Sequence, residues 1–157
     1  EWDHLQPGSK TPLRFKVLLE LCRRFHEEPM NLGVQFSSSR DIYHHFQTRL
    51  GNLKQERFII VILDNKHRFL SETTVTVGLL NRSLVHPREV FAEAIEQRAA
   101  AIICIHNHPS GDSSPSEEDK RITRRLQESG ELLGIPLLDH IIISKEDFTS
   151  FADEGWL

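Results

Sequence analysis

Two stretches of the chain are continuously apolar and rich in β-branched residues, as strands buried on both faces of a sheet are. They are residues 58–63 and 101–105. Residues 68–74 and 75–80 have the alternating or β-branched composition of one or two further strands, and residues 135–143 predict another. The apolar pattern therefore predicts a sheet whose central strands are covered on both sides.

Helical periodicity separates these strands. Apolar residues recur at helical spacing in residues 11–26 and 40–50, the second helix being capped by Ser39. Another helix opens at His86-Pro87, with an inner face of Val90, Phe91, Ala94 and Ile95. The last covers residues 117–129 and ends at Gly130. This order predicts an α/β fold, a three-layer α/β/α sandwich around a mixed β-sheet, with an N-terminal helix.

A break rich in Pro, Asn, Gly and Ser divides the chain. We expect an N-terminal helical segment at residues 1–28, a linker at 29–35 and the main domain at 36–157. The first segment is the most basic part of the chain, and its charges are typical of a solvated helix face.

Composition narrows the classes of function. At 157 residues, 38% hydrophobic and 27% charged, the chain fits one globular domain with a short extra element. Its net charge of -4 argues against a protein whose main task is coating DNA. No stretch has the apolar length of a membrane span, and the start lacks a signal-peptide pattern, so we expect part of a cytoplasmic protein with no membrane partner. Cys22 and Cys104 lie in different elements and suggest neither a disulfide framework nor a thiolate zinc site.

The densest polar chemistry follows residues 101–105. His106 and His108 alternate with Asn107 in an extended segment, so both imidazoles project to the same side. If Ser114 caps the next helix and forms a capping box with Glu117, then Ser116 and Asp119 are left over. These two lie on one face of the first turn and can point back toward the histidines.

Two imidazoles and a carboxylate make a three-ligand set with an open fourth position, which is typical of catalytic zinc. The same residues are compatible with loop histidines beside a second capping box formed by Ser116 and Asp119. The spacing alone leaves both interpretations open.

The fuller motif is specific. His-x-His followed by ten residues and Asp119, with Ser116 three residues earlier, resembles the metal signature of the JAMM (MPN-plus) metalloprotease domains. The string His-Asn-His-Pro-Ser-Gly-Asp is similar to the RadC branch of that superfamily, and the likeness reaches residues 55–58, 138–142 and 150–151. It implies an MPN/JAB-like domain, with a cytidine-deaminase-like layout, over roughly residues 36–157.

The resemblance also implies a site. One Zn²⁺ per chain would be held by His106, His108 and Asp119. Glu56 would be the general base, and Ser116 would donate a hydrogen bond to the oxyanion of the tetrahedral intermediate. The implied activity is that of a metallopeptidase or isopeptidase with a peptide or protein substrate. Asn107 departs from the deubiquitinating members, which carry Ser or Thr there, so the substrate stays open.

Three alternative functions compete with this one. A zinc nucleobase deaminase needs His-x-Glu followed by Pro-Cys-x-x-Cys, and no Pro-Cys-x-x-Cys occurs in the sequence. An HNH nuclease is suggested only by the letters of residues 106–108. The remaining alternative is a non-proteolytic DNA repair or recombination accessory module that acts through DNA or protein partners. The N-terminal segment is similar to the tail of a helix-hairpin-helix module, a kind associated with DNA backbones.

Asp139 and His140 interrupt an otherwise apolar predicted strand. Burying such a pair costs free energy unless both side chains are hydrogen-bonded. They either orient a metal ligand or form a polar pair satisfied at the edge of the sheet, and the sequence favours neither.

Overall fold

A computed structural model describes residues 17–18, 32–78 and 85–157. Most of the predicted N-terminal helix, together with the end of the predicted strand at 75–80, lies outside these residues. Among the described helices, none is both long and apolar enough to cross a membrane.

The centre of the domain is a five-stranded mixed sheet in the order β2-β1-β3-β4-β5. Its central strand, β3, pairs antiparallel with β1 and parallel with β4, and the outer pairs are antiparallel. The strand bounds are β1 Arg57–Leu63, β2 Phe69–Val77, β3 Ala101–Asn107, β4 Leu137–Ile143 and β5 Phe148–Ser150. A parallel neighbour requires a crossover, and the long helix between β3 and β4 supplies it.

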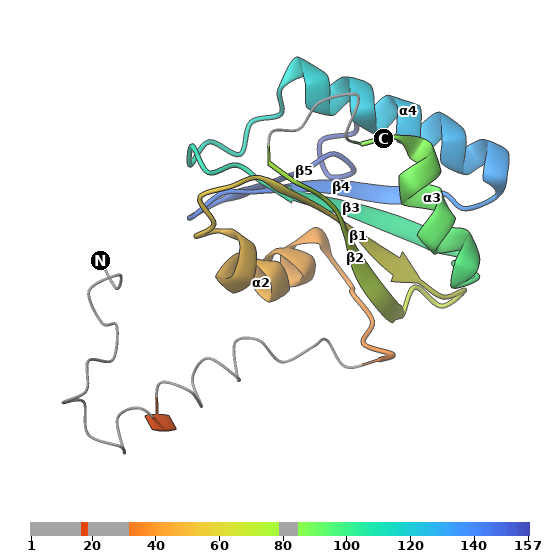
Figure 1. Ribbon diagram of the computed structural model, residues 1–157, viewed down its shortest axis with the longest axis horizontal. Helices are drawn as coiled ribbons and strands as arrows, with labels where there is room; N and C mark the ends of the chain where they lie inside the picture. The colour runs from red at the N-terminus through yellow and green to blue at the C-terminus, as the bar shows by residue number, and fades with distance from the viewer. Residues whose placement is uncertain (1–16, 19–31, 79–84) are drawn as a thin grey trace.

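Helices cover both faces of this sheet (Figure 1). The helix α2, Ser39–Leu50, lies on one face, whereas α3, Pro87–Glu96, and α4, Glu117–Leu133, lie on the other. The predicted α/β sandwich around a mixed sheet is therefore confirmed.

The core has two halves because alternate residues of the central strands face opposite layers. Ile59, Val61 and Leu63 of β1 pack in the same cluster as α2. Phe58, Ile60 and Ile62 pack in the cluster that includes α3 and α4. A strand covered on both sides has no polar face, which explains the continuous apolar run in the sequence.

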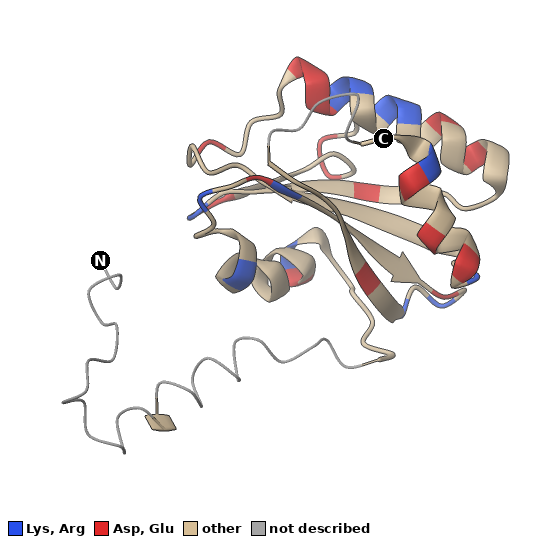
Figure 2. Cartoon of the chain, viewed as in Figure 1, with Lys and Arg blue, Asp and Glu red and all other residues tan. Residues whose placement is uncertain are grey.

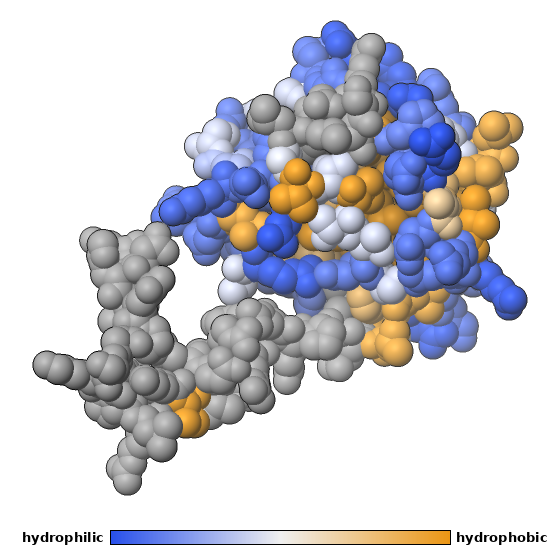
Figure 3. Space-filling view, viewed as in Figure 1, coloured by the Kyte–Doolittle hydropathy of each residue, from blue (hydrophilic) through white to orange (hydrophobic). Residues whose placement is uncertain are grey.

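Three local predictions differ from the structure. Residues 69–77 form one continuous strand, with register irregularities opposite β1 that accommodate its twist. The cap of α2 is Ser38, whose hydroxyl accepts a hydrogen bond from the Asp41 amide, so the helix begins at Ser39. Ile95 was expected on the inner face of α3 but is 54% exposed. Figure 3 shows apolar surface on the side of the molecule where α3 and α4 both end.

The helix α4 passes through Gly130 and continues to Leu133, so the prediction that Gly130 ends it was wrong. Gly134 ends the helix, with φ of 71° in the left-handed region that glycine tolerates. Gly130 is needed for another reason, namely close packing. A Cβ atom there would lie 2.5 Å from the Ile135 carbonyl oxygen and 3.2 Å from Phe91 Cζ.

We therefore expect Gly130→Ala to destabilise the domain by about 1–3 kcal/mol, although alanine normally favours a helix over glycine. Chemical denaturation followed by circular dichroism measures the loss. Ser129→Ala, one position earlier, is the control and should change the stability by less than about 0.5 kcal/mol. A Gly130→Ala variant as stable as the parent would contradict the close-packing role.

Candidate metal centre

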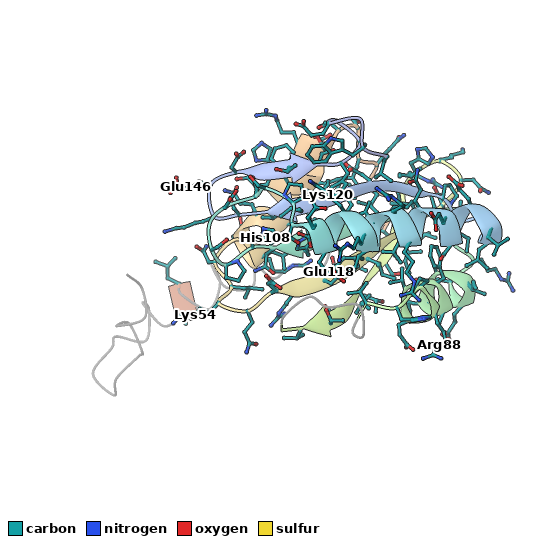
Figure 4. The ribbon with its side chains drawn as sticks, turned by 90° about the horizontal axis from the view of Figure 1, so that it is seen from above. Lys54, Arg88, His108, Glu118, Lys120 and Glu146 are labelled. Carbon is teal, nitrogen blue, oxygen red and sulfur yellow. The ribbon has the colours of Figure 1, made fainter. Side chains whose placement is uncertain are left out.

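The candidate site forms where the end of β3 meets the start of α4. His106 and Asn107 are the last residues of β3, and His108 follows directly. The His108 amide donates to the carbonyl of Ile143, the last residue of the parallel neighbour β4. In Figure 4, His108 lies beside the first turn of α4, where Glu118 and Lys120 point to opposite sides of the helix. Strand continuation through His106 thus holds the site on a rigid element.

Three potential ligands converge here. Nε2 of His106 lies 2.9 Å from Nε2 of His108 and 3.3 Å from Oδ1 of Asp119, while His108 Nε2 lies 3.5 Å from Asp119 Oδ2. His106 and Asp119 are almost completely buried, and His108 is partly exposed. Within the described residues, these three form a group able to hold a metal ion.

A buried chain of hydrogen bonds sets the tautomer of His106. The Thr123 hydroxyl donates to the Asp119 carbonyl oxygen at 2.7 Å, so it can only accept from His140 Nδ1, 2.5 Å away. Nε2 of His140 then carries a lone pair and accepts from Nδ1 of His106 at 2.8 Å. This leaves the lone pair of His106 Nε2 directed at the site.

A single hydrogen bond sets the tautomer of His108. Its Nδ1 lies 2.8 Å from the Asp112 carbonyl oxygen, which can only accept a hydrogen bond. Two Nε2 lone pairs would then face each other at 2.9 Å, an arrangement that needs a cation, either a proton or a metal ion.

The three residues fit zinc. Ligand atoms about 2.0–2.1 Å from a tetrahedral zinc ion lie about 3.3 Å from one another. The separations of 2.9, 3.3 and 3.5 Å lie close to this value. The ionised carboxylate and the neutral His106 that such an ion requires are also the states that the surroundings favour, whereas His108 would release a proton when the ion binds.

The electrostatics agree with this assignment. Burial, together with the neighbouring His140, holds the pKa of His106 well below 6.5. Burial also raises the pKa of Asp119, but hydrogen bonds from His108 and Ser116 outweigh it, so this carboxyl stays ionised. His108 experiences burial too, yet the Asp119 carboxylate and the Asp112 carbonyl raise its pKa. In metal-free protein, a proton on His108 therefore occupies the place that a metal ion would take.

The start of α4 corrects the predicted cap. Ser116, not Ser114, is the N-cap, and it forms a capping box with Asp119. Ser114 instead donates its amide to the Asp112 side chain at 2.8 Å, which holds it in the preceding turn. Ser116 and Asp119 nevertheless stay beside the histidines. The Ser116 hydroxyl donates to Asp119 Oδ2 at 2.6 Å, and its amide donates to the same oxygen at 2.7 Å.

An acidic first turn precedes basic residues on α4 (Figure 2). Glu117, Glu118 and Asp119 lie at its N-terminus, where the helix dipole stabilises negative charge. Glu117 and Glu118 pair with Lys120 and Arg121. Asp119 instead points inward to His106 and His108. The first turn of α4 therefore supplies a carboxylate to the site.

Glu56 is brought to the same end of the sheet by the pairing of β1 with β3. Phe58 of β1 lies opposite His106 in this antiparallel pair, so the residues before β1 lie beside those that follow β3. Glu56 is partly buried, and its charge helps to raise the pKa of His108. The structure thus places this predicted base near the three potential ligands.

Asp139 and His140 are not at a sheet edge, because β4 lies between β3 and β5. His140 orients His106, as one of the two sequence-based interpretations had it. Asp139 accepts hydrogen bonds from the His140 amide, the Ser150 hydroxyl and the Ala152 amide. Thr123 was missed in the sequence, where its only signal is its position four residues after Asp119, on the same face of α4.

These features define an α/β domain with a candidate metal centre of two histidines and one aspartate at the end of its central strand. Residues 36–156 match the family described as RadC-like JAB domain. The chain belongs to this family, as its motif had indicated.

Curated relatives support the assignment. A UPF0758 protein of Syntrophotalea carbinolica is 47% identical over 150 residues, which cover 96% of this chain and 66% of that protein. UPF0758 proteins of Geobacter sulfurreducens and Thermotoga maritima are 43% and 42% identical over 151 and 150 residues, with 96% of this chain covered in each case. These stretches are 66% and 67% of those two relatives. The chain thus spans about two thirds of the length of the relatives it matches.

Removing the Thr123 hydroxyl should weaken metal binding. In Thr123→Val, His140 Nδ1 has no acceptor, so the tautomer of His106 is no longer set, and we expect zinc affinity to fall about 10–100-fold. Competition with a chromophoric chelator at neutral pH measures it. Thr123→Ser keeps the hydroxyl and is the matched control. Equal affinities for the valine and serine variants would show that the hydrogen-bonded chain does not support the ligand.

The buried imidazoles should make the metal-free protein sensitive to acid. Burial lowers the pKa of His140 to about 4, and the pKa of His106 is lowered too, whereas unfolded histidines titrate near 6.5. The unfolded state therefore binds more protons below pH 6.5, so the free energy of unfolding falls as the pH drops toward 4. His140 alone corresponds to roughly 3 kcal/mol over that range, and His108, with its raised pKa, opposes part of the effect.

Urea denaturation in the presence of a chelator, repeated between pH 7 and pH 4.5, measures this slope. His140→Gln should flatten it, while His44→Gln, a change at an exposed histidine, should leave it unchanged. If the free energy of unfolding of the parent protein is constant over this range, the buried histidines do not make the protein sensitive to acid.

Proposed function

We propose that this domain is a zinc-dependent hydrolase that cleaves peptide or isopeptide bonds. The observation that carries the proposal is the convergence of the His106, His108 and Asp119 ligand atoms beside Glu56. Imidazole nitrogen and carboxylate oxygen suit zinc, and a set of three protein ligands keeps a position open for water or substrate.

Bound zinc would supply a water whose pKa is lowered to about 7, together with a Lewis acid for the substrate carbonyl. Glu56 would act as the general base and take a proton from the water that attacks the carbonyl carbon. The same carboxyl then donates the proton to the departing amine, so the C–N bond breaks without release of an unprotonated amide anion. Its place at the rim of the site, partly buried, is compatible with both transfers.

Ser116 is the proposed donor to the oxyanion that develops on the carbonyl oxygen. Its hydroxyl donates to Asp119 Oδ2 in the absence of substrate, and a rotation about the Cα–Cβ bond would redirect it. The capping interactions made through the Ser116 amide do not depend on that rotation. Donors of this kind typically contribute about 10²–10³ in rate.

The proposal extends to the organisation of the whole protein. Residues 36–157 would be the catalytic domain, acting on peptides or proteins in the cytoplasm. Residues 1–28, followed by the linker 29–35, would form a separate N-terminal segment, the tail of a helix-hairpin-helix module. A contact with DNA would then belong to that N-terminal side.

The test combines metal content with hydrolysis. Protein purified without a histidine tag should contain about one zinc per chain by elemental analysis, and His106→Ala and Asp119→Ala should lose it. Against a panel of fluorogenic peptides and isopeptide-linked conjugates, Glu56→Gln should keep the zinc but lose hydrolysis by at least about 10²-fold. Glu89→Gln, at an exposed glutamate on α3, is the matched control and should behave as the parent protein.

Parent protein that binds no zinc after reconstitution at neutral pH would refute the proposal. Zinc-loaded protein that hydrolyses none of these substrates would refute the peptidase part. Binding to DNA or to a protein partner, with no hydrolysis, would then favour the accessory module.

A further inference from the structure

Asn107 is the one residue of the His-Asn-His motif that the proposed chemistry does not use. It is only 1% exposed, although its side chain offers no ligand to the site. A buried amide is costly unless its polar atoms are hydrogen-bonded, so the partners of this side chain indicate its role.

Both polar atoms of the Asn107 side chain bind the segment that precedes β1. The Arg57 amide donates to Oδ1 at 2.8 Å, and Nδ2 donates to the Gln55 carbonyl oxygen at 3.2 Å. These partners also settle which atom is oxygen, because a flipped amide would place NH₂ against the Arg57 N–H. The two partners flank Glu56 in the sequence.

This clamp fixes the backbone of Glu56 and the direction of its Cα–Cβ bond. The peptide unit before Glu56 is held through the Gln55 carbonyl, and the unit after it is held through the Arg57 amide. The Glu56 carbonyl also accepts a hydrogen bond from the Gly78 amide at 2.8 Å. With both flanking peptide planes fixed, φ and ψ of Glu56 are fixed, and so is its Cα–Cβ bond.

The clamp acts where regular strand pairing stops. The pairing of β1 with β3 ends at Phe58 and His106, one residue short of Arg57 and Asn107. Beyond this point the Asn107 side chain, rather than backbone pairing, links the start of β1 to β3. A segment held by these hydrogen bonds has less conformational freedom than the same segment without them.

We propose that Asn107 is a positioning residue, which holds the Glu56 carboxyl toward His108 by clamping the peptide units on both sides of Glu56. A serine at this position has a single polar atom close to Cα, which cannot occupy the places of both Oδ1 and Nδ2. The catalytic consequence rests on the proposed function, whereas the positional consequence does not.

The positional part is tested by hydrogen exchange of the Arg57 amide, measured by NMR on the purified protein, with or without added zinc. Asn107→Ser should accelerate this exchange about tenfold, because the amide loses its acceptor. Asn107→Asp keeps an acceptor oxygen for Arg57, so the exchange should stay closer to that of the parent. Asn65→Ser, a matched change at an exposed asparagine, should leave it unchanged. Circular dichroism checks that each variant folds.

The catalytic part is tested on whichever substrate the parent protein cleaves. Asn107→Ser should lower kcat about 10–100-fold while zinc content and KM stay unchanged, because Glu56 is misplaced but the ligands are not. Loss of zinc in Asn107→Ser would overturn the inference, since the residue would then support the ligands. Unchanged Arg57 exchange in Asn107→Ser would overturn it as well.

Hydrogen exchange of the Arg57 amide tests the inference even if the protein hydrolyses no substrate. A parent protein without activity refutes the proposed function but leaves the clamp to be judged by Arg57 exchange alone. A folded Asn107→Ser variant with fast Arg57 exchange and parental kcat would overturn the catalytic consequence while leaving the proposed hydrolase intact.

Discussion

The structure depends on one electrostatic constraint, which is that two imidazole lone pairs and a carboxylate share a buried space. His106 Nε2 and His108 Nε2 are 2.9 Å apart, with Asp119 beside both. Such an arrangement is stable only if each group has a defined protonation state and a cation balances them. The protonation states are set by the hydrogen bonds that link His106, His140 and Thr123, and by the one that the Asp112 carbonyl accepts from His108.

The sheet topology makes the constraint possible. Because β3 lies between an antiparallel and a parallel neighbour, the start of β1 and the end of β4 lie at the same end of the sheet as His106. The crossover helix α4 returns over the sheet from that end, so its first turn lies next to the site. Residues from four separate segments of the sequence therefore meet without any long loop having to be ordered.

Capping and packing interactions are shared with the site, which couples stability to chemistry. Ser116 and Asp119 form the capping box of α4 and also line the candidate metal centre. His140 stacks on Phe151 near the C-terminus while it orients His106. Substitutions here change folding and ligand geometry together, so metal content and hydrogen exchange separate the two effects better than activity alone.

By itself, the sequence determined the class of fold, the family and the identity of the candidate ligands, because apolar periodicity and a fixed spacing between His106 and Asp119 are local properties. Strand and helix ends were less well determined: several serines precede α4, and only the Asp112 side chain, by binding the Ser114 amide, leaves Ser116 as the cap. The role of His140 and the contact of Asn107 with both neighbours of Glu56 were decided by tertiary structure alone. Hydrogen bonds between residues far apart in the chain depend on strand pairing, and no local pattern of residues specifies them.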